Sequence, residues 1–81
     1  MNDIEAQVEV INARMFKKRL NQDCSQYIGW KEINDTFASF KARDVIREHL
    51  LLGHKVTAGY FATSVRGYHR YSIFWKEKTN G

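Results

Sequence analysis

The chain has 81 residues and a formal net charge of +4 at pH 7. This length supports one domain, so a two-domain enzyme is excluded. Hydrophobic residues make up 43% of the chain and aromatic residues 14%, which is enough apolar material for a small core and excludes an intrinsically disordered chain. The single cysteine, Cys24, excludes an internal disulfide framework and is typical of a protein from a reducing compartment.

The sequence shows no membrane or secretion signal. No run approaches the ~20 consecutive apolar residues that cross a bilayer. The stretch from Met1 to Glu5 lacks the basic start and the apolar segment of a signal peptide. We therefore expect a soluble, cytoplasmic protein with no membrane partner.

Positive charge gathers in the second half of the chain. Residues 1–40 contain five Lys and Arg against six Asp and Glu, whereas residues 41–76 contain seven against two. A polyanionic partner is therefore expected to contact mainly the segment from Lys41 to Lys76.

The first predicted element is an amphipathic helix over about residues 4–20. Asp3 suits its N-cap, and the basic group at 17–19 suits the negative end of the helix dipole. The polar stretch 21–26 is predicted to be a loop, followed by a short extended segment at Tyr27 and Ile28 that Gly29 ends. The apolar residues of the helix recur at the spacing of one helix face: Ile4, Val8, Ile11, Met15, Phe16 and Leu20.

Two further helices are predicted in close succession. Trp30, Ile33 and Phe37 stand at i, i+3 and i+7, which predicts a helix of about two turns. Ser39 is the predicted N-cap of the next helix, which Gly53 ends in a left-handed conformation. A link of about two residues makes these helices cross steeply, as in a helix-turn-helix. The apolar positions of the third helix are Ala42, Val45, Ile46, His49 and Leu50.

The last part of the chain is predicted to form a β-hairpin. Lys55–Ser64 and Tyr68–Lys76 are rich in β-branched and aromatic residues, and Gly67 supplies the positive φ of the turn between them. We expect one domain over residues 1–81 that is ordered over about 4–76. Its predicted core is Ile4, Val8, Ile11, Met15, Trp30, Ile33, Phe37, Val45, Ile46 and Leu50.

This order of elements resembles the winged-helix variant of the helix-turn-helix fold over about residues 4–76. The resemblance is carried by Gly29–Ile33 at the start of the middle helix, Val45–Gly53 at the end of the third helix, and the basic hairpin Phe61–Tyr71. It implies an α+β fold of three helices followed by a C-terminal β-hairpin wing. Size and composition are similar to those of small regulators of phage, plasmid or bacterial origin.

The resemblance implies that the third helix binds in the major groove of double-stranded DNA, while the wing contacts phosphates or the minor groove. Arg43 and Arg47 lie one turn apart, so one can pair with guanine while the other contacts phosphate. The expected function is a sequence-specific regulator of transcription, acting as a repressor, or of recombination. The candidate DNA-binding residues are Ser39, Lys41, Arg43, Asp44, Arg47, Arg66, Gly67, His69 and Arg70.

Aromatic residues occupy both faces of the predicted hairpin: Tyr60, Phe61, Tyr71, Phe74 and Trp75. Only one face can pack on the helices, so the other is expected at the surface. Three alternatives explain this surplus: a homodimer through the aromatic hairpin or the first helix, stacking on the bases of a single strand, or a protein partner. In the last case the chain is a winged-helix protein-binding module or a phage-type inhibitor.

The residues that could support catalysis form no recognised motif. His49 lies on the apolar side of its helix and is predicted to be a packed histidine, and His54 and His69 lie on other elements. Cys24 and the three histidines lack the spacing of a zinc site. No phosphate-binding glycine loop or nucleophile motif occurs. We expect neither an enzyme nor a bound cofactor or metal.

Overall fold

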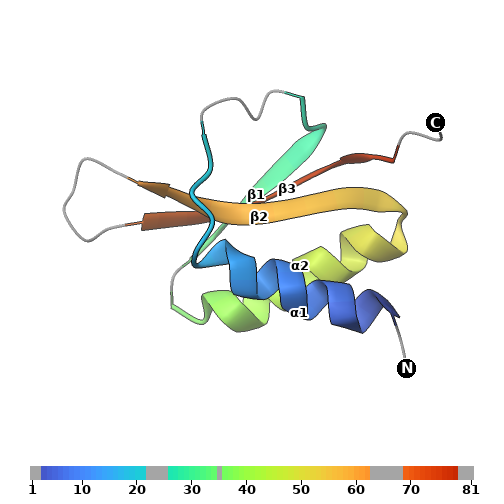
Figure 1. Ribbon diagram of the computed structural model, residues 1–81, viewed down its shortest axis with the longest axis horizontal. Coiled ribbons are helices and arrows are strands. Elements are labelled where there is room, and N and C mark those ends of the chain that lie inside the picture. Colours follow the sequence, from blue (N-terminus) through green and yellow to red (C-terminus); the bar gives the residue numbers. More distant parts are fainter. Residues whose placement is uncertain (1–2, 22–25, 35, 63–68, 79–81) are drawn as a thin grey trace.

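The molecule has two layers, a sheet and a pair of helices. The computed structural model describes residues 3–21, 26–34, 36–62 and 69–78. Its elements follow the order α1 (Asp3–Met15), β1 (Gly29–Ile33), α2 (Ala38–Leu51), β2 (His54–Ala62) and β3 (His69–Glu77). The strands form an antiparallel sheet in the order β1-β3-β2, and both helices lie against the same face of it (Figure 1).

The core lies between the helices and one face of the sheet. Ile73 of the central strand β3 is paired with Lys31 on one side and Ala58 on the other, and it is fully buried. Burying these apolar side chains provides most of the favourable free energy of folding. The buried residues of this cluster are Val8, Met15, Ile33, Ala38, Ala42, Ile46, Leu50, Ala58 and Ile73.

The opposite face of the sheet, which we call the outer face, is not packed against either helix. Side chains alternate along a strand, so Tyr71, Ile73 and Trp75 point towards the helices while their neighbours point away. The described strand residues of the outer face are Trp30, Glu32, Lys55, Thr57, Gly59, Phe61, Arg70, Ser72, Phe74 and Lys76.

The prediction of three helices followed by a hairpin wing is wrong. The segment from Gly29 to Ile33 is a strand rather than the start of a middle helix, and it pairs with β3. The helical spacing was based on only three apolar residues, Trp30, Ile33 and Phe37, and so short a pattern is also compatible with a strand. Pairing with β3 overrides the local preference for a helix. As a result Trp30 and Phe37, both predicted in the core, are 59% and 68% exposed.

The first helix is shorter than predicted, because the chain after Met15 turns and pairs with β2. The Leu20 amide donates to the Tyr60 carbonyl oxygen at 2.8 Å, and the Tyr60 amide donates to the Lys18 carbonyl oxygen at 2.9 Å. Gly59 permits this approach, since a Cβ there would lie 2.5 Å from the Lys18 carbonyl oxygen. Residues 18–20 therefore lie along the free edge of β2 and not on a helix.

The third predicted helix and the hairpin strands are confirmed as elements. Helix α2 begins one residue before Ser39, so Phe37 and not Ser39 holds the cap position, with φ 64°. Gly53 follows the helix with φ 83°, as predicted. Strands β2 and β3 fall within two residues of their predicted bounds, while the predicted turn with Arg66 and Gly67 lies outside the described residues.

Candidate functional site

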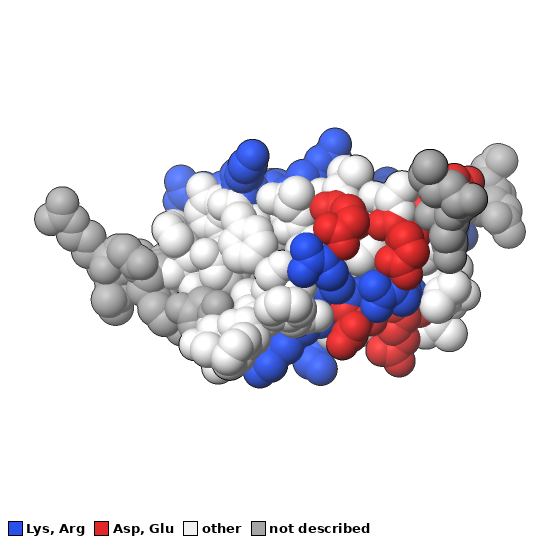
Figure 2. All heavy atoms as spheres, turned by 90° about the horizontal axis from the view of Figure 1, so that it is seen from below, with Lys and Arg blue, Asp and Glu red and all other residues white. Residues whose placement is uncertain are grey.

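The two arginines of α2 that were predicted to contact DNA, Arg43 and Arg47, are engaged in ion pairs between the helices. Arg43 Nε lies 2.7 Å from Glu9 Oε1, and Arg47 Nε lies 2.6 Å from Glu5 Oε1. Each guanidinium donates a second hydrogen bond to the other oxygen of its carboxylate, at 3.2 and 3.1 Å. These are bidentate pairs, the strongest geometry for arginine and carboxylate. Figure 2 shows the resulting patch of opposite charges over the helix layer.

These hydrogen bonds also affect the acidity of both partners. Hydrogen bonding from Arg47 and Arg43 lowers the pKa of Glu5 and of Glu9 below the ordinary value for a glutamate. The same bonds raise the pKa of both arginines. The pairs are therefore fully ionised near neutral pH, and both guanidinium groups already have anionic partners.

The remaining predicted residues of α2 also contact the protein itself or face solvent. Ser39 Oγ accepts hydrogen bonds from Asn12 Nδ2 at 3.1 Å and Arg43 Nη1 at 2.6 Å. Asp44 accepts a hydrogen bond from Arg47 at 3.1 Å. Lys41 is exposed on α2. The predicted recognition helix thus uses much of its polar surface to hold α1.

The hairpin residues lie elsewhere. His69 packs edge-on against Tyr60, with ring centres 4.8 Å apart. Arg70 projects from the outer face, opposite to the side that carries α2. The structure therefore does not bring Arg70 and the α2 residues to one surface.

The outer face instead carries a cluster of aromatic rings, which we call the aromatic platform: Tyr27, Trp30, Phe61 and Phe74. Phe74 lies at its centre and is 7% exposed. The centres of the Tyr27, Phe61 and Trp30 rings lie 5.6, 6.0 and 6.2 Å from that of Phe74. Trp30 is nearly parallel to Phe74, with an interplanar angle of 26°. The platform is a packed surface whose edge rings reach solvent.

Cations surround the aromatic platform. The guanidinium carbon of Arg70 lies 5.6 Å from the centre of the Phe61 ring, and Lys76 Nζ lies 5.2 Å from that of Tyr27. Lys55 stands directly opposite Lys76 in the register of β2 and β3. Lys18 Nζ donates to Thr57 Oγ1 at 2.9 Å. We call Lys18, Lys55, Arg70 and Lys76 the platform cations.

Acidic residues are scarce on this face. Of the described strand residues that point outward, Glu32 is the single acid, and it lies 3.6 Å from Arg70. Within the described residues, no ion pair involves Lys18, Lys55 or Lys76. The outer face is therefore cationic, whereas the helix layer balances its charges internally.

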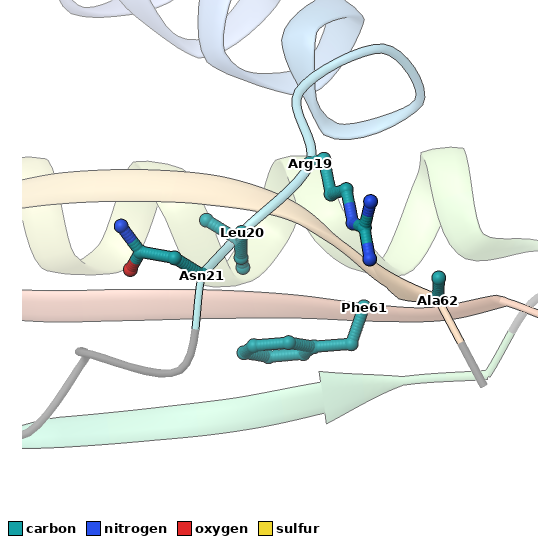
Figure 3. A pocket seen from close by; sticks show the side chains of 5 residues that line it. All are labelled: Arg19, Leu20, Asn21, Phe61 and Ala62. Carbon is teal, nitrogen blue, oxygen red and sulfur yellow. The ribbon is translucent and has the colours of Figure 1, made fainter. Parts of the chain in front are cut away.

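A hollow of about 450 Å³ adjoins the platform at the edge of β2. It is lined by Arg19, Leu20, Asn21, Phe61 and Ala62. In Figure 3 the Phe61 ring lies beside the extended segment at residues 19–21, and the Arg19 side chain runs towards Ala62. The hollow thus places an aromatic ring beside an arginine.

His49 and His54 form a separate pair on the helix side of the sheet. His49 Nδ1 lies 2.9 Å from His54 Nδ1, and His49 stacks on Trp75 with ring centres 3.7 Å apart. Burial lowers the pKa of His49, and the proximity of His54 lowers it further. His49 is a packed histidine, as predicted, and His54 lies on a different element, also as predicted, but the contact between the two rings was not foreseen.

Neither α1 nor α2 has the length and apolarity that crossing a membrane requires. No group of three or more His, Cys, Asp or Glu in the described part of the chain is arranged to hold a metal ion.

Sequence reasoning missed the platform because it placed Trp30 in a helix. The relevant signal was the excess of hairpin aromatics, together with the alternation of cations and Phe74 along Arg70–Lys76. Comparisons with protein-family models, curated proteins and solved structures find no match to this chain.

Proposed function

We propose that the protein binds nucleic acid through the outer face of its sheet. The observation that carries this proposal is the placement of Lys55 directly opposite Lys76 beside the aromatic platform. Like charges directly opposite each other destabilise a sheet. An anionic ligand that contacts both ammonium groups would offset this repulsion. Ligand binding would therefore explain why two lysines stand opposite each other.

Nucleic acid matches the surface better than other anions do. The platform offers flat rings for bases, and the surrounding cations offer partners for phosphates. An acidic protein would satisfy the cations but would leave the aromatic surface without planar partners. A cytoplasmic location, where nucleic acid is accessible, forms part of the proposal.

Binding of double-stranded DNA through α2 stays a prediction, and its geometry is less favourable. Arg43 and Arg47 would have to leave Glu9 and Glu5 in order to contact bases or phosphates. Lys41, by contrast, is exposed on α2 without belonging to the outer face. A substitution of Lys41 therefore distinguishes binding through α2 from binding through the outer face.

The proposal predicts a modest but measurable salt dependence. If Lys18, Lys55 and Lys76 each neutralise one phosphate, the slope of log K against log salt is about −2 for a single strand and about −3 for a duplex. Lys55→Ala or Lys76→Ala should reduce the slope by about 0.7 to 0.9. Fluorescence polarisation with labelled oligonucleotides between about 50 and 200 mM salt measures this effect.

The control is Lys41→Ala, which should leave both affinity and slope unchanged. If Lys41→Ala lowers the slope and the two platform variants do not, then α2 is the contact surface. Absence of binding to single strands and duplexes at low salt would reject the proposed function altogether.

A homodimer or another protein partner also stays a prediction. Sedimentation of the free chain should precede the titrations, because a dimer that buries the outer face would remove the platform from solvent. A protein that is monomeric at the concentrations of the binding assay keeps this surface accessible.

A further inference from the structure

We infer that the ligand of the outer face is a single strand of nucleic acid whose bases stack on Trp30 and Phe61. This inference rests on the proposed function and specifies the class of ligand. Its starting point is Trp30, which is 59% exposed although it is the largest side chain of the outer face. An indole so exposed on a strand contributes little to the core, but it presents a ring to a ligand.

The orientation of Trp30 is set by the platform beneath it. Its ring packs against Phe74 in an offset, nearly parallel arrangement, which is a preferred geometry for aromatic pairs. Phe74 is almost completely buried and lies too deep to stack on a base itself. It supports Trp30 on one side and Phe61 on the other, so these two rings form the accessible stacking surfaces.

A duplex cannot use these rings. Its bases are stacked on one another, and a sheet face that presents rings reaches base planes only where the bases are unpaired. The major groove of B-form DNA admits a helix or a two-stranded ribbon. The outer face is a three-stranded surface, so a duplex would touch the platform cations but would leave Trp30 and Phe61 without stacking partners.

The surroundings of Phe61 extend this site. The hollow beside its ring is lined by Arg19 and Asn21 (Figure 3). A guanidinium suits a phosphate. A base stacked on Phe61 would thus have Arg19 nearby to contact its phosphate. At the other end of the face, Lys55 and Lys76 are placed to contact the backbone of the same strand.

Tryptophan fluorescence tests the inference directly. The chain has two tryptophans, and Trp75 stacks on His49 on the opposite face of the sheet. Trp75→Phe keeps a ring on His49 and leaves Trp30 as the reporter. Titration of this variant with oligo-dT and oligo-U, each about eight nucleotides long and within the range of small single-strand sites, should quench Trp30. A hairpin whose stem stays paired at the assay temperature should leave its emission nearly unchanged.

Affinity measurements on the otherwise unchanged chain provide the second arm. Trp30→Ala should weaken binding of the single strands about 5- to 150-fold, the range for loss of one stacked base. Trp30→Leu retains an apolar contact with Phe74 and tests the same point if the alanine variant folds poorly. Phe40→Ala is the matched control, because Phe40 is 70% exposed but lies on α2, and it should bind like the original chain.

The outcomes separate the two proposals. Quenching by either oligo-dT or oligo-U, with weaker binding by the Trp30 variants, supports the inference. Equal affinity for duplex and single strands, unaffected by both Trp30 variants, overturns the inference but leaves nucleic-acid binding intact. If no nucleic acid binds at low salt, the proposed function fails and the inference fails with it.

Discussion

At Phe37 the backbone adopts a conformation that a bulky side chain rarely takes. Its φ is 64°, and its carbonyl oxygen accepts the amides of Phe40 and Lys41, both at 3.1 Å, as α2 begins. The left-handed conformation costs a residue with a Cβ about 1–2 kcal/mol, and the ring is 68% exposed. Phe37→Gly should therefore raise the free energy of unfolding by about 1 kcal/mol. Urea denaturation measures the change, and a loss of stability would mean that the Phe37 ring makes a net stabilising contribution.

His49 should make the stability of the protein depend on pH. Its pKa is lowered from an ordinary value of 6.5, first by burial and then by His54, so the unfolded chain binds a proton more readily than the folded protein. The contribution to stability is complete above about pH 6.5 and is lost as the pH falls from there through the lowered pKa. The melting temperature should thus fall between about pH 7.5 and 5.5.

Substitution of His49 isolates its contribution to this decrease in the melting temperature. His49→Gln should make the melting temperature less dependent on pH, whereas His69→Gln, at the far end of β3, should keep the original dependence. Identical pH profiles for His49→Gln and the original chain would contradict this assignment.

The helices are joined by two ion pairs, Glu5 with Arg47 and Glu9 with Arg43, whose members are four residues apart on each helix. Charge exchange tests whether these pairs orient α1 against α2. Glu9→Arg and Arg43→Glu should each lower the melting temperature, because each places like charges together. The double variant should recover most of the loss, although the contact of Arg43 with Ser39 is not restored.

Thermal unfolding of the four proteins completes this cycle. Losses that simply add in the double variant would show that the two residues do not interact. The double variant should also bind nucleic acid as the original chain does, since the proposed contact surface lies on the other side of the sheet.

On the scale of the whole molecule, the two surfaces use charge differently. The helix layer brings arginines and carboxylates together at its surface (Figure 2), so these opposite charges largely neutralise one another. The outer face combines lysines that lack ion pairs among the described residues with rings packed around Phe74. Because only one face of the sheet is covered by the helices (Figure 1), the other face can present both kinds of group to a ligand.

Local patterns in the sequence were sufficient to predict some elements of this structure. The spacing of Ala42, Ile46 and Leu50 predicted α2, since positions four residues apart lie on one helix face whatever surrounds them. The aromatic and β-branched runs predicted the hairpin strands, and the concentration of cations after residue 40 predicted a polyanionic partner, a prediction that the binding experiments will test.

Tertiary structure alone decided the positions of Trp30, Arg43 and Arg47. Trp30 lies on a strand because β3 offers hydrogen-bonding partners to β1 across more than 40 residues of sequence. The arginines face α1 because folding brings Glu5 and Glu9 beside them. Hydrophobic periodicity indicates only which conformation a short segment can adopt, whereas pairing between distant segments depends on the free energy of the whole folded chain. In this protein, long-range pairing placed Trp30 on the outer face of the sheet and Arg43 and Arg47 against α1.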